Sequence, residues 1–267
     1  MGKGKRFNGK EKETVTQTTE NENNKTRKNV KRNKKRFNIN TMFIIIFSII
    51  LIFSIVQIVM WYINTKNEEK EYQKLFEQVV NTDTINNIES ESVQTEKVSI
   101  DFEQLLNINK DVVGWIIIDG TNINYPILKS SDNDYYLKRD INKNISKSGS
   151  IFLDYRSKGF SNQNTVVYGH NMKNGTMFSQ LKRIYNNELG TEIKIKIYTP
   201  EEEKVYKVFS TYTIKPGDFE MDSKIDELQK MSKIDFGVTV EENDKILTLF
   251  TCTDSMLERI IVHAVLE

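Results

Sequence analysis

Residues 245–252 read KILTLFTC, and residues 259–266 read RIIVHAVL. Each run is short and mainly apolar with β-branched residues, and a short, more polar segment separates the two. This pattern predicts two neighbouring β-strands joined by a short loop. The loop would bring Arg259, at the start of the second strand, close to Cys252, at the end of the first.

Six further runs upstream have the same strand-like character. They are residues 112–118, 123–128, 149–154, 165–168, 192–198 and 204–214. Between the strands, helix-like segments are predicted at residues 102–106, 177–185 and 223–231. Many short strands separated by turn residues predict a mainly β fold, either a closed barrel or a sandwich, with peripheral helices.

Residues 42–63 (MFIIIFSIILIFSIVQIVMWYI) contain no charged side chain. As a helix they would extend about 33 Å, enough to cross the hydrocarbon core of a bilayer. The basic cluster at residues 31–36 precedes the run, so the positive-inside rule predicts a cytoplasmic N-terminus and an extracellular C-terminal part. A cleaved signal peptide is the alternative. It is disfavoured because the run is long and no A-x-A-like site follows it.

Four parts of the chain follow from this reading. We expect a basic, disordered cytoplasmic tail at residues 1–41, a transmembrane anchor at 42–63, an extracellular helix and linker at 64–97, and a folded domain at 98–267. Within the third part, residues 67–80 have helical spacing and residues 81–97 have no periodicity. The tail lies beside an apolar span, which predicts contact with anionic lipid rather than with nucleic acid.

Cys252 is the only cysteine, so no intrachain disulfide can form. A lone cysteine in a chain that leaves the cytosol is either a reactive thiol or a small buried apolar residue. The chain has two histidines. His170 follows a predicted strand and precedes a turn at residues 173–175, which places it at a surface. His263 has apolar neighbours within the last strand and is interpreted as structural or as lying at the rim.

A thiol, an imidazole and a guanidinium at strand ends are suited to acyl transfer. The thiolate of Cys252 would be the nucleophile, and the imidazole of His170 would donate a proton to a leaving amine. The guanidinium of Arg259 would stabilise an oxyanion. The sequence contains no metal-binding, dinucleotide or phosphate-loop motif, so we expect no metal and no cofactor; scattered acidic residues leave a calcium site open.

Several ordered motifs in residues 98–267 resemble the sortases, and specifically class B. They are LLNINKDVVGWI (105–116), NINYP (122–126), DNDYYL (132–137), GSIFLD (149–154), YGHNM (168–172), GTMF (175–178) and TLFTC (248–252). The resemblance implies an eight-stranded β-barrel with peripheral helices and a groove that ends at the cysteine. One of these helices would precede the cysteine strand, where residues 223–231 are predicted to be helical.

The resemblance also implies a reaction. Cys252 would cleave a C-terminal sorting signal after threonine and form a thioester, with His170 as acid and base and Arg259 at the bound carbonyl or oxyanion. An amino group of a cell-wall peptide would then resolve the thioester. The implied partners are surface proteins that carry a sorting signal, the peptidoglycan precursor amine and, through the N-terminal helix, the lipid bilayer.

Five residues are expected to line the substrate groove. Asn133, Leu137 and Tyr168 match groove positions of the family, and Asp254 lies two residues past the cysteine, where some class B members have an acidic residue. Phe250 is a departure, because many class B enzymes have serine there and use its hydroxyl in substrate binding. The interval between the cysteine and the arginine is also short for class B, so a tight loop is expected.

Three other functions remain open on the sequence. A pilin-polymerising sortase would usually have an N-terminal lid and a second, C-terminal span, and neither is visible. A catalytically silent, surface-anchored binding module would keep the barrel, and Phe250 gives it some support. A membrane-tethered peptidase would hydrolyse the thioester without ligation.

Overall fold

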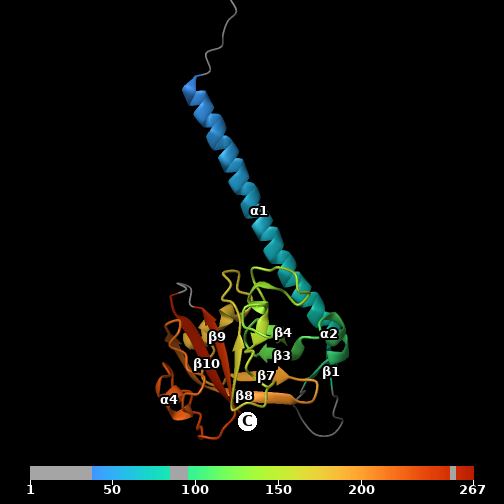
Figure 1. Cartoon of the computed structure of the whole chain (residues 1–267), viewed down its shortest axis with the longest axis vertical. Coiled ribbons are helices and arrows are strands. Elements are labelled where there is room, and N and C mark those ends of the chain that lie inside the picture. The colour runs from blue at the N-terminus through green and yellow to red at the C-terminus, as the bar shows by residue number, and fades with distance from the viewer. Residues whose placement is uncertain (1–37, 85–95, 253–256) are drawn as a thin grey trace, which may run out of the picture. The chain divides into compact units, whose positions relative to one another are not determined.

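The computed structural model describes residues 38–84, 96–252 and 257–267 (Figure 1). Most of the predicted basic tail, residues 1–37, therefore lies outside the described residues. The side chain of Cys252 and the whole of residues 253–256, including Asp254, also lie outside them. The chain divides into two compact units, Met1–Val59 and Met60–Glu267.

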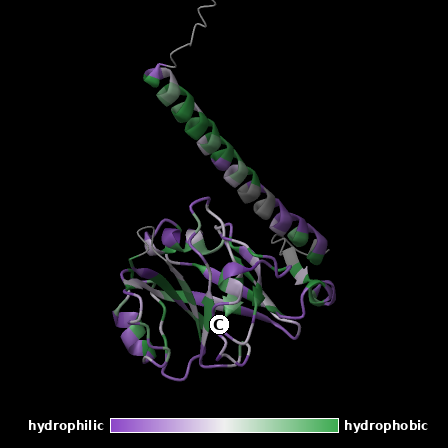
Figure 2. Cartoon of the chain, turned by 45° about the horizontal axis from the view of Figure 1, so that its top comes forward, coloured by the Kyte–Doolittle hydropathy of each residue, from purple (hydrophilic) through white to green (hydrophobic). Residues whose placement is uncertain are grey.

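The helix α1 (Ile39–Val79) contains the predicted apolar run. Its segment Ile39–Ile63 is long and apolar enough to cross a membrane, and its large apolar side chains are exposed. Figure 2 shows the change from apolar to polar residues along this helix. Exposed apolar side chains over such a length are typical of a membrane anchor or a signal sequence.

The predicted helix at residues 67–80 forms the last part of α1, where Leu75 and Val79 are buried. Beyond it, the structure differs from the prediction of an irregular linker. A two-stranded antiparallel ribbon is formed by β1 (Val80–Thr84) and β2 (Glu96–Ile100). Polar, non-alternating residues make up most of β1, so periodicity could not reveal this strand.

Eight strands close the predicted barrel. They are β3 (Val112–Ile118), β4 (Asn124–Leu128), β5 (Ile151–Leu153), β6 (Asn164–Tyr168), β7 (Lys194–Tyr198), β8 (Glu203–Ile214), β9 (Ile246–Cys252) and β10 (Arg259–Leu266). Their order around the barrel is β10-β8-β7-β3-β4-β5-β6-β9, with β9 pairing to β10. The β4–β5 and β6–β9 pairs are parallel and the others antiparallel. The mainly β, eight-stranded fold is therefore confirmed.

Short helices surround the barrel, and each of the three predicted helical segments between the strands overlaps at least one of them. They are α2 (Phe102–Ile108), the 3-10 helices η1 (Tyr136–Lys138) and η2 (Phe178–Gln180), α3 (Leu181–Tyr185) and α4 (Ile225–Lys230). At the start of α2, the carboxylate of Asp101 accepts a hydrogen bond from the Gln104 amide at 2.9 Å. This contact satisfies an amide that has no partner within the helix, so Asp101 fixes where α2 begins.

Alternation along β9 divides its side chains between the two faces of the barrel wall. Leu247 and Leu249 are buried in the main core, whereas Ile246 and Phe250 belong to an outer cluster with Ile225 and Leu228 of α4. A strand that is apolar on both faces reads as a continuous hydrophobic run. This explains why residues 246–250 of β9 (ILTLF) have no polar side chain that faces water.

His263 lies inside a chain of hydrogen bonds and is fully buried. The Thr248 hydroxyl donates to the Asn164 side-chain oxygen at 2.7 Å, so its oxygen accepts from Nδ1 of His263 at 2.9 Å. Nε2 then accepts from the Tyr212 hydroxyl, also at 2.9 Å. Burial lowers the pKa of His263 to about 3. The ring is therefore neutral and structural, and the alternative of a position at the rim is excluded by its burial.

We expect His263 to make stability depend on pH. The unfolded chain binds a proton at this histidine below about pH 6.5, whereas the folded chain does not bind it until about pH 3. The unfolded state therefore binds more protons in this window. The contribution of His263 to the free energy of unfolding should fall by up to ~1.4 kcal/mol per pH unit as the pH drops through it.

Denaturant unfolding of the full chain in detergent micelles, at pH 7 and pH 5, measures this contribution. His263→Gln keeps a polar side chain but removes the titrating ring, so its stability should fall less between the two pH values. An equal fall in the wild type and the variant would contradict the prediction.

Candidate active site

The backbone of Cys252 lies directly opposite Arg259 in the antiparallel pair formed by β9 and β10. Residues directly opposite in such a pair have their Cβ atoms about 4.5–5.5 Å apart on one face of the sheet. Arg259 is half-buried, and its guanidinium donates a hydrogen bond to the Glu258 carbonyl at 3.1 Å. The expected proximity of these two positions is thus present in the backbone register.

His170 follows β6 on the other side of β9. These two strands are parallel, with Tyr168 opposite Phe250, and the Gly169 amide donates to the Phe250 carbonyl at 3.2 Å. His170 lies two residues beyond Tyr168, and Cys252 lies two residues beyond Phe250. The pairing therefore brings the two backbones to the same end of the barrel, with β9 between β6 and β10.

A backbone carbonyl contacts the imidazole of His170. Nε2 lies 2.8 Å from the Leu137 oxygen, and because a carbonyl can only accept, Nε2 carries a proton in this contact. The backbone of His170 is held as well, because its carbonyl accepts a hydrogen bond from the Phe178 amide at 2.9 Å. From the sequence, Leu137 is expected only as a groove residue through its side chain. No residue pattern reveals a backbone contact of this kind.

Gly149 permits the backbone of Leu137 to lie where it does. Gly149 has a φ of +57°, and a Cβ there would be 2.6 Å from the Leu137 oxygen and 2.8 Å from the Tyr136 oxygen. Only a residue without a side chain fits so close to a backbone carbonyl. Gly149 is thus the local reason why the carbonyl that contacts His170 can occupy its position.

Four aromatic rings contact one another in a row that includes Phe250 of β9. The centroid of Tyr168 lies 5.4 Å from that of Phe152 and 5.3 Å from that of Phe250. Phe250 in turn contacts Phe219 edge to face, also at 5.3 Å. Tyr168, Phe250 and Phe219 are each half-buried. Two expected groove residues, Tyr168 and Phe250, therefore touch each other and form an apolar surface.

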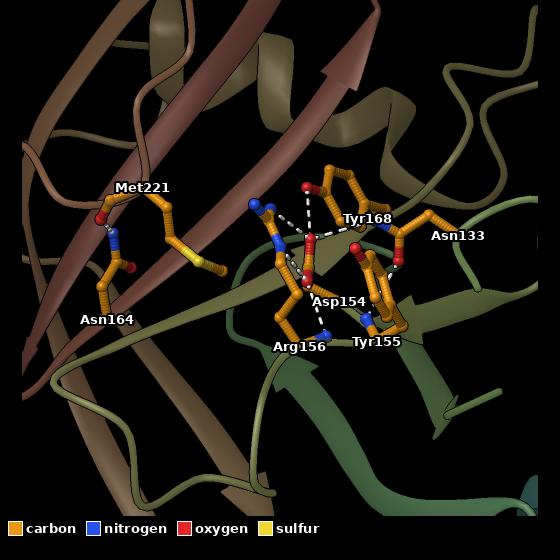
Figure 3. A network of polar contacts seen from close by, with 7 residues as sticks. All are labelled: Asn133, Asp154, Tyr155, Arg156, Asn164, Tyr168 and Met221. Atoms are coloured by element: carbon orange, nitrogen blue, oxygen red, sulfur yellow. Dashed lines mark hydrogen bonds and ion pairs between the residues drawn. The ribbon is translucent and has the colours of Figure 1, made fainter. Parts of the chain in front are cut away.

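Next to this row, hydrogen bonds converge on the carboxylate of Asp154, which has no exposed side-chain surface (Figure 3). It accepts from the Tyr168 hydroxyl at 2.9 Å and from the Asn133 amide at 3.0 Å. The guanidinium of Arg156 binds both carboxylate oxygens, each at 2.9 Å. Burial alone would raise the pKa of Asp154, but the hydrogen bonds from Arg156, Asn133 and Tyr168 outweigh it and lower the pKa to about 2.

Asn133 and Tyr168 thus bind the same carboxylate, that of Asp154, which was not among the residues expected to form the site. Asp154 ends the GSIFLD motif, and Arg156 lies two residues later, so a turn can bring the two side chains together. That local pair of opposite charges was the one signal for the network. Within the described ranges, no group of three or more His, Cys, Asp or Glu residues could hold a metal ion.

Comparison with known proteins gives one family. Residues 116–267 match the Sortase family, described as a sortase domain. A curated sortase B of Staphylococcus aureus is 36% identical over 248 residues, which cover 86% of this chain and 96% of the relative.

Solved structures give the same result. A crystal structure of Bacillus anthracis sortase B in complex with AAEK1 has a TM-score of 0.63 and 35% identity, over 78% of this chain and 98% of that one. A Staphylococcus aureus sortase B–substrate complex has a TM-score of 0.57 and 34% identity, over 62% of this chain and 84% of that one. The chain belongs to the sortase B family of cysteine transpeptidases.

Proposed function

We propose that this sortase cleaves a C-terminal sorting signal after threonine and joins the released carbonyl to an amine of a cell-wall peptide. Cys252 is the nucleophile, His170 the acid and base, and Arg259 the group that stabilises the oxyanion. The observation that carries the proposal is the pairing of β9 with β6 on one edge and β10 on the other. The backbone of Cys252 lies directly opposite that of Arg259, which further supports it.

In the first step, the Cys252 thiolate attacks the threonine carbonyl carbon and forms a C–S bond. The oxyanion develops beside Arg259, whose fixed positive charge stabilises it. His170 donates a proton to the leaving nitrogen as the peptide C–N bond breaks, which leaves a thioester. In the second step, the incoming amine attacks the thioester carbonyl, its proton passes to His170 and the thiolate departs.

The two proposed substrates, a sorting peptide and a peptide amine, are inferred from solved relatives and from the expected groove residues. A sortase B of Staphylococcus aureus has been solved as a substrate complex, and a further sortase B structure is complexed with triglycine. By analogy, the groove residues Asn133, Leu137, Tyr168, Phe250 and Asp254 hold the sorting peptide of a surface protein. A glycine-like peptide amine linked to the peptidoglycan precursor accepts it.

The proposal includes the membrane arrangement. Residues 1–41 form a cytoplasmic tail, residues 42–63 an uncleaved anchor, residues 64–97 an extracellular connection and residues 98–267 the catalytic domain. The exposed apolar part of α1 and the basic cluster before it support this topology. An extracellular catalytic domain also fits a reaction whose acceptor belongs to the cell wall.

Cys252→Ala should abolish ligation, because no other group in the chain can form the thioester. We expect the rate to fall roughly a thousandfold or more, as when other catalytic nucleophiles are removed. The full chain in detergent micelles is given NPQTN- and SPKTG-like peptides with and without triglycine, and mass spectrometry identifies the products.

Turnover by Cys252→Ala at the wild-type rate would contradict the assignment of the nucleophile. If the wild-type chain hydrolysed the peptide but formed no triglycine adduct, the protein would be a peptidase. Neither cleavage nor a thioester with any peptide would indicate a silent binding module.

Gly149→Ala should slow ligation because its methyl group would displace the Leu137 carbonyl from His170. Gly159→Ala is the matched control, since Gly159 also has a positive φ, of +65°, but nothing lies within 4 Å of its added Cβ. Both variants carry a left-handed alanine, which costs about 1–2 kcal/mol. We expect Gly149→Ala to reduce the initial rate at least about tenfold more than the control, with folding checked by circular dichroism. Equal rates for the two variants would mean that the carbonyl contact has no catalytic role.

A further inference from the structure

We propose that Asp154 is a positioning residue of this transpeptidase, whose buried carboxylate fixes the imidazole of His170 through two separate structural connections. One runs through Tyr168 and the other through Asn133 and the loop that ends at Leu137. The inference rests on the proposed function for its catalytic consequence. The positioning itself can be measured without catalysis.

The first connection is the side chain of Tyr168, two residues before His170 in the chain. Its hydroxyl donates to Asp154 at 2.9 Å, and its ring contacts both Phe152 and Phe250. The hydrogen bond anchors the polar end of this ring, while the two aromatic contacts hold its apolar part. Asp154 thereby fixes the end of β6 from which the His170 loop departs.

The second connection begins at Asn133. Its amide nitrogen donates to Asp154 at 3.0 Å, and its oxygen accepts from the Tyr155 amide at 3.0 Å, so both ends of the side chain are held (Figure 3). The loop continues to Leu137, whose carbonyl contacts Nε2 of His170 at 2.8 Å. Asn133 is therefore the point where the loop that contacts the imidazole is attached to the β5–β6 corner.

A carboxylate is required at this position because every group around it is a donor. Oδ2 accepts from Asn133, Tyr168 and the Arg156 guanidinium, and Oδ1 accepts from the Arg156 amide and Nε. An asparagine in the same place would direct its NH₂ group at two or three other donors, whichever way it was turned. Arg156 supplies the positive charge that makes a buried carboxylate tolerable.

The test variant is therefore Asp154→Asn, which keeps the size and shape of the side chain. Its matched control is Arg156→Lys, which keeps the positive charge beside Asp154 but loses the planar, two-pronged contact. The Lys variant leaves Asn133 and Tyr168 bound to Asp154. A role limited to stabilising the fold would affect both variants, whereas a positioning role affects Asp154→Asn much more.

The structural readout is the Nε2–H resonance of His170 in the full chain, labelled with ¹⁵N-histidine in detergent micelles. The chain has two histidines, so His170→Gln identifies the signal. We expect a hydrogen-bonded, exchange-protected Nε2–H in the wild type and in Arg156→Lys. In Asp154→Asn the protection should be lost. If protection is unchanged in Asp154→Asn, the proposal is wrong.

The kinetic readout is ligation of a sorting peptide to triglycine. We expect kcat to fall by about 10- to 100-fold in Asp154→Asn, with the KM for triglycine within about threefold of the wild type, because the carboxylate has no exposed surface that an acceptor could contact. Arg156→Lys should keep kcat within about twofold. Equal losses in the two variants, each proportional to the fall in Tm, would assign Asp154 a structural role only and overturn the proposal.

Two further variants keep the test decisive if Asp154→Asn does not fold. Tyr168→Phe and Asn133→Ala each remove one connection, and each should weaken the protection of the His170 Nε2–H in part. Full protection in both would overturn the proposal. If the wild type gives no ligated product at all, the proposed function fails, and the resonance still decides whether Asp154 positions the ring.

Discussion

The parallel pairing of β6 with β9 is the constraint on which the candidate active site depends. It fixes Tyr168 opposite Phe250. Because the two strands run in the same direction, His170 and Cys252, each two residues further on, reach the same end of the barrel. A slip of one residue would turn every side chain of one strand to the other face. The buried leucines of β9 prevent such a slip, because they would leave the main core. Core packing and the geometry of the site are therefore determined by the same register.

Local patterns in the sequence were sufficient for the strands and for one side of the site. All eight barrel strands lie close to the predicted segments, since short apolar runs bounded by turn residues are a strong signal. The neighbouring positions of Cys252 and Arg259 followed from the short connection between two strands. The position of His170 did not, because parallel pairing between distant segments leaves no local pattern. The sequence placed His170 at a strand end and suggested its role as a proton donor, but only the resemblance to a family implied that it lies near Cys252.

The features that were missed have physical reasons of the same kind. The contact between Leu137 and His170 uses a backbone oxygen, which every residue has, and the residue that permits it is a glycine elsewhere in the chain. Asp154 acquires its importance from donors on three different segments. Its carboxylate is fully buried, whereas the Arg156 side chain beside it is about half exposed, so the carboxylate depends on all of these donors. Only one arrangement of the three segments lets all of these donors bind the Asp154 carboxylate at once.

The burial of His263 has a consequence for the order of chemical events. Its ring is neutral, fully buried and hydrogen-bonded through both nitrogens, so it cannot exchange protons with a substrate. The chain has two histidines, and under the proposed mechanism only His170 remains for this task. One ring must then release a proton before it can receive the next, so the leaving peptide departs before the acceptor reacts. Under that proposed mechanism, the first product leaves before the second substrate reacts, which is the order of a ping-pong scheme.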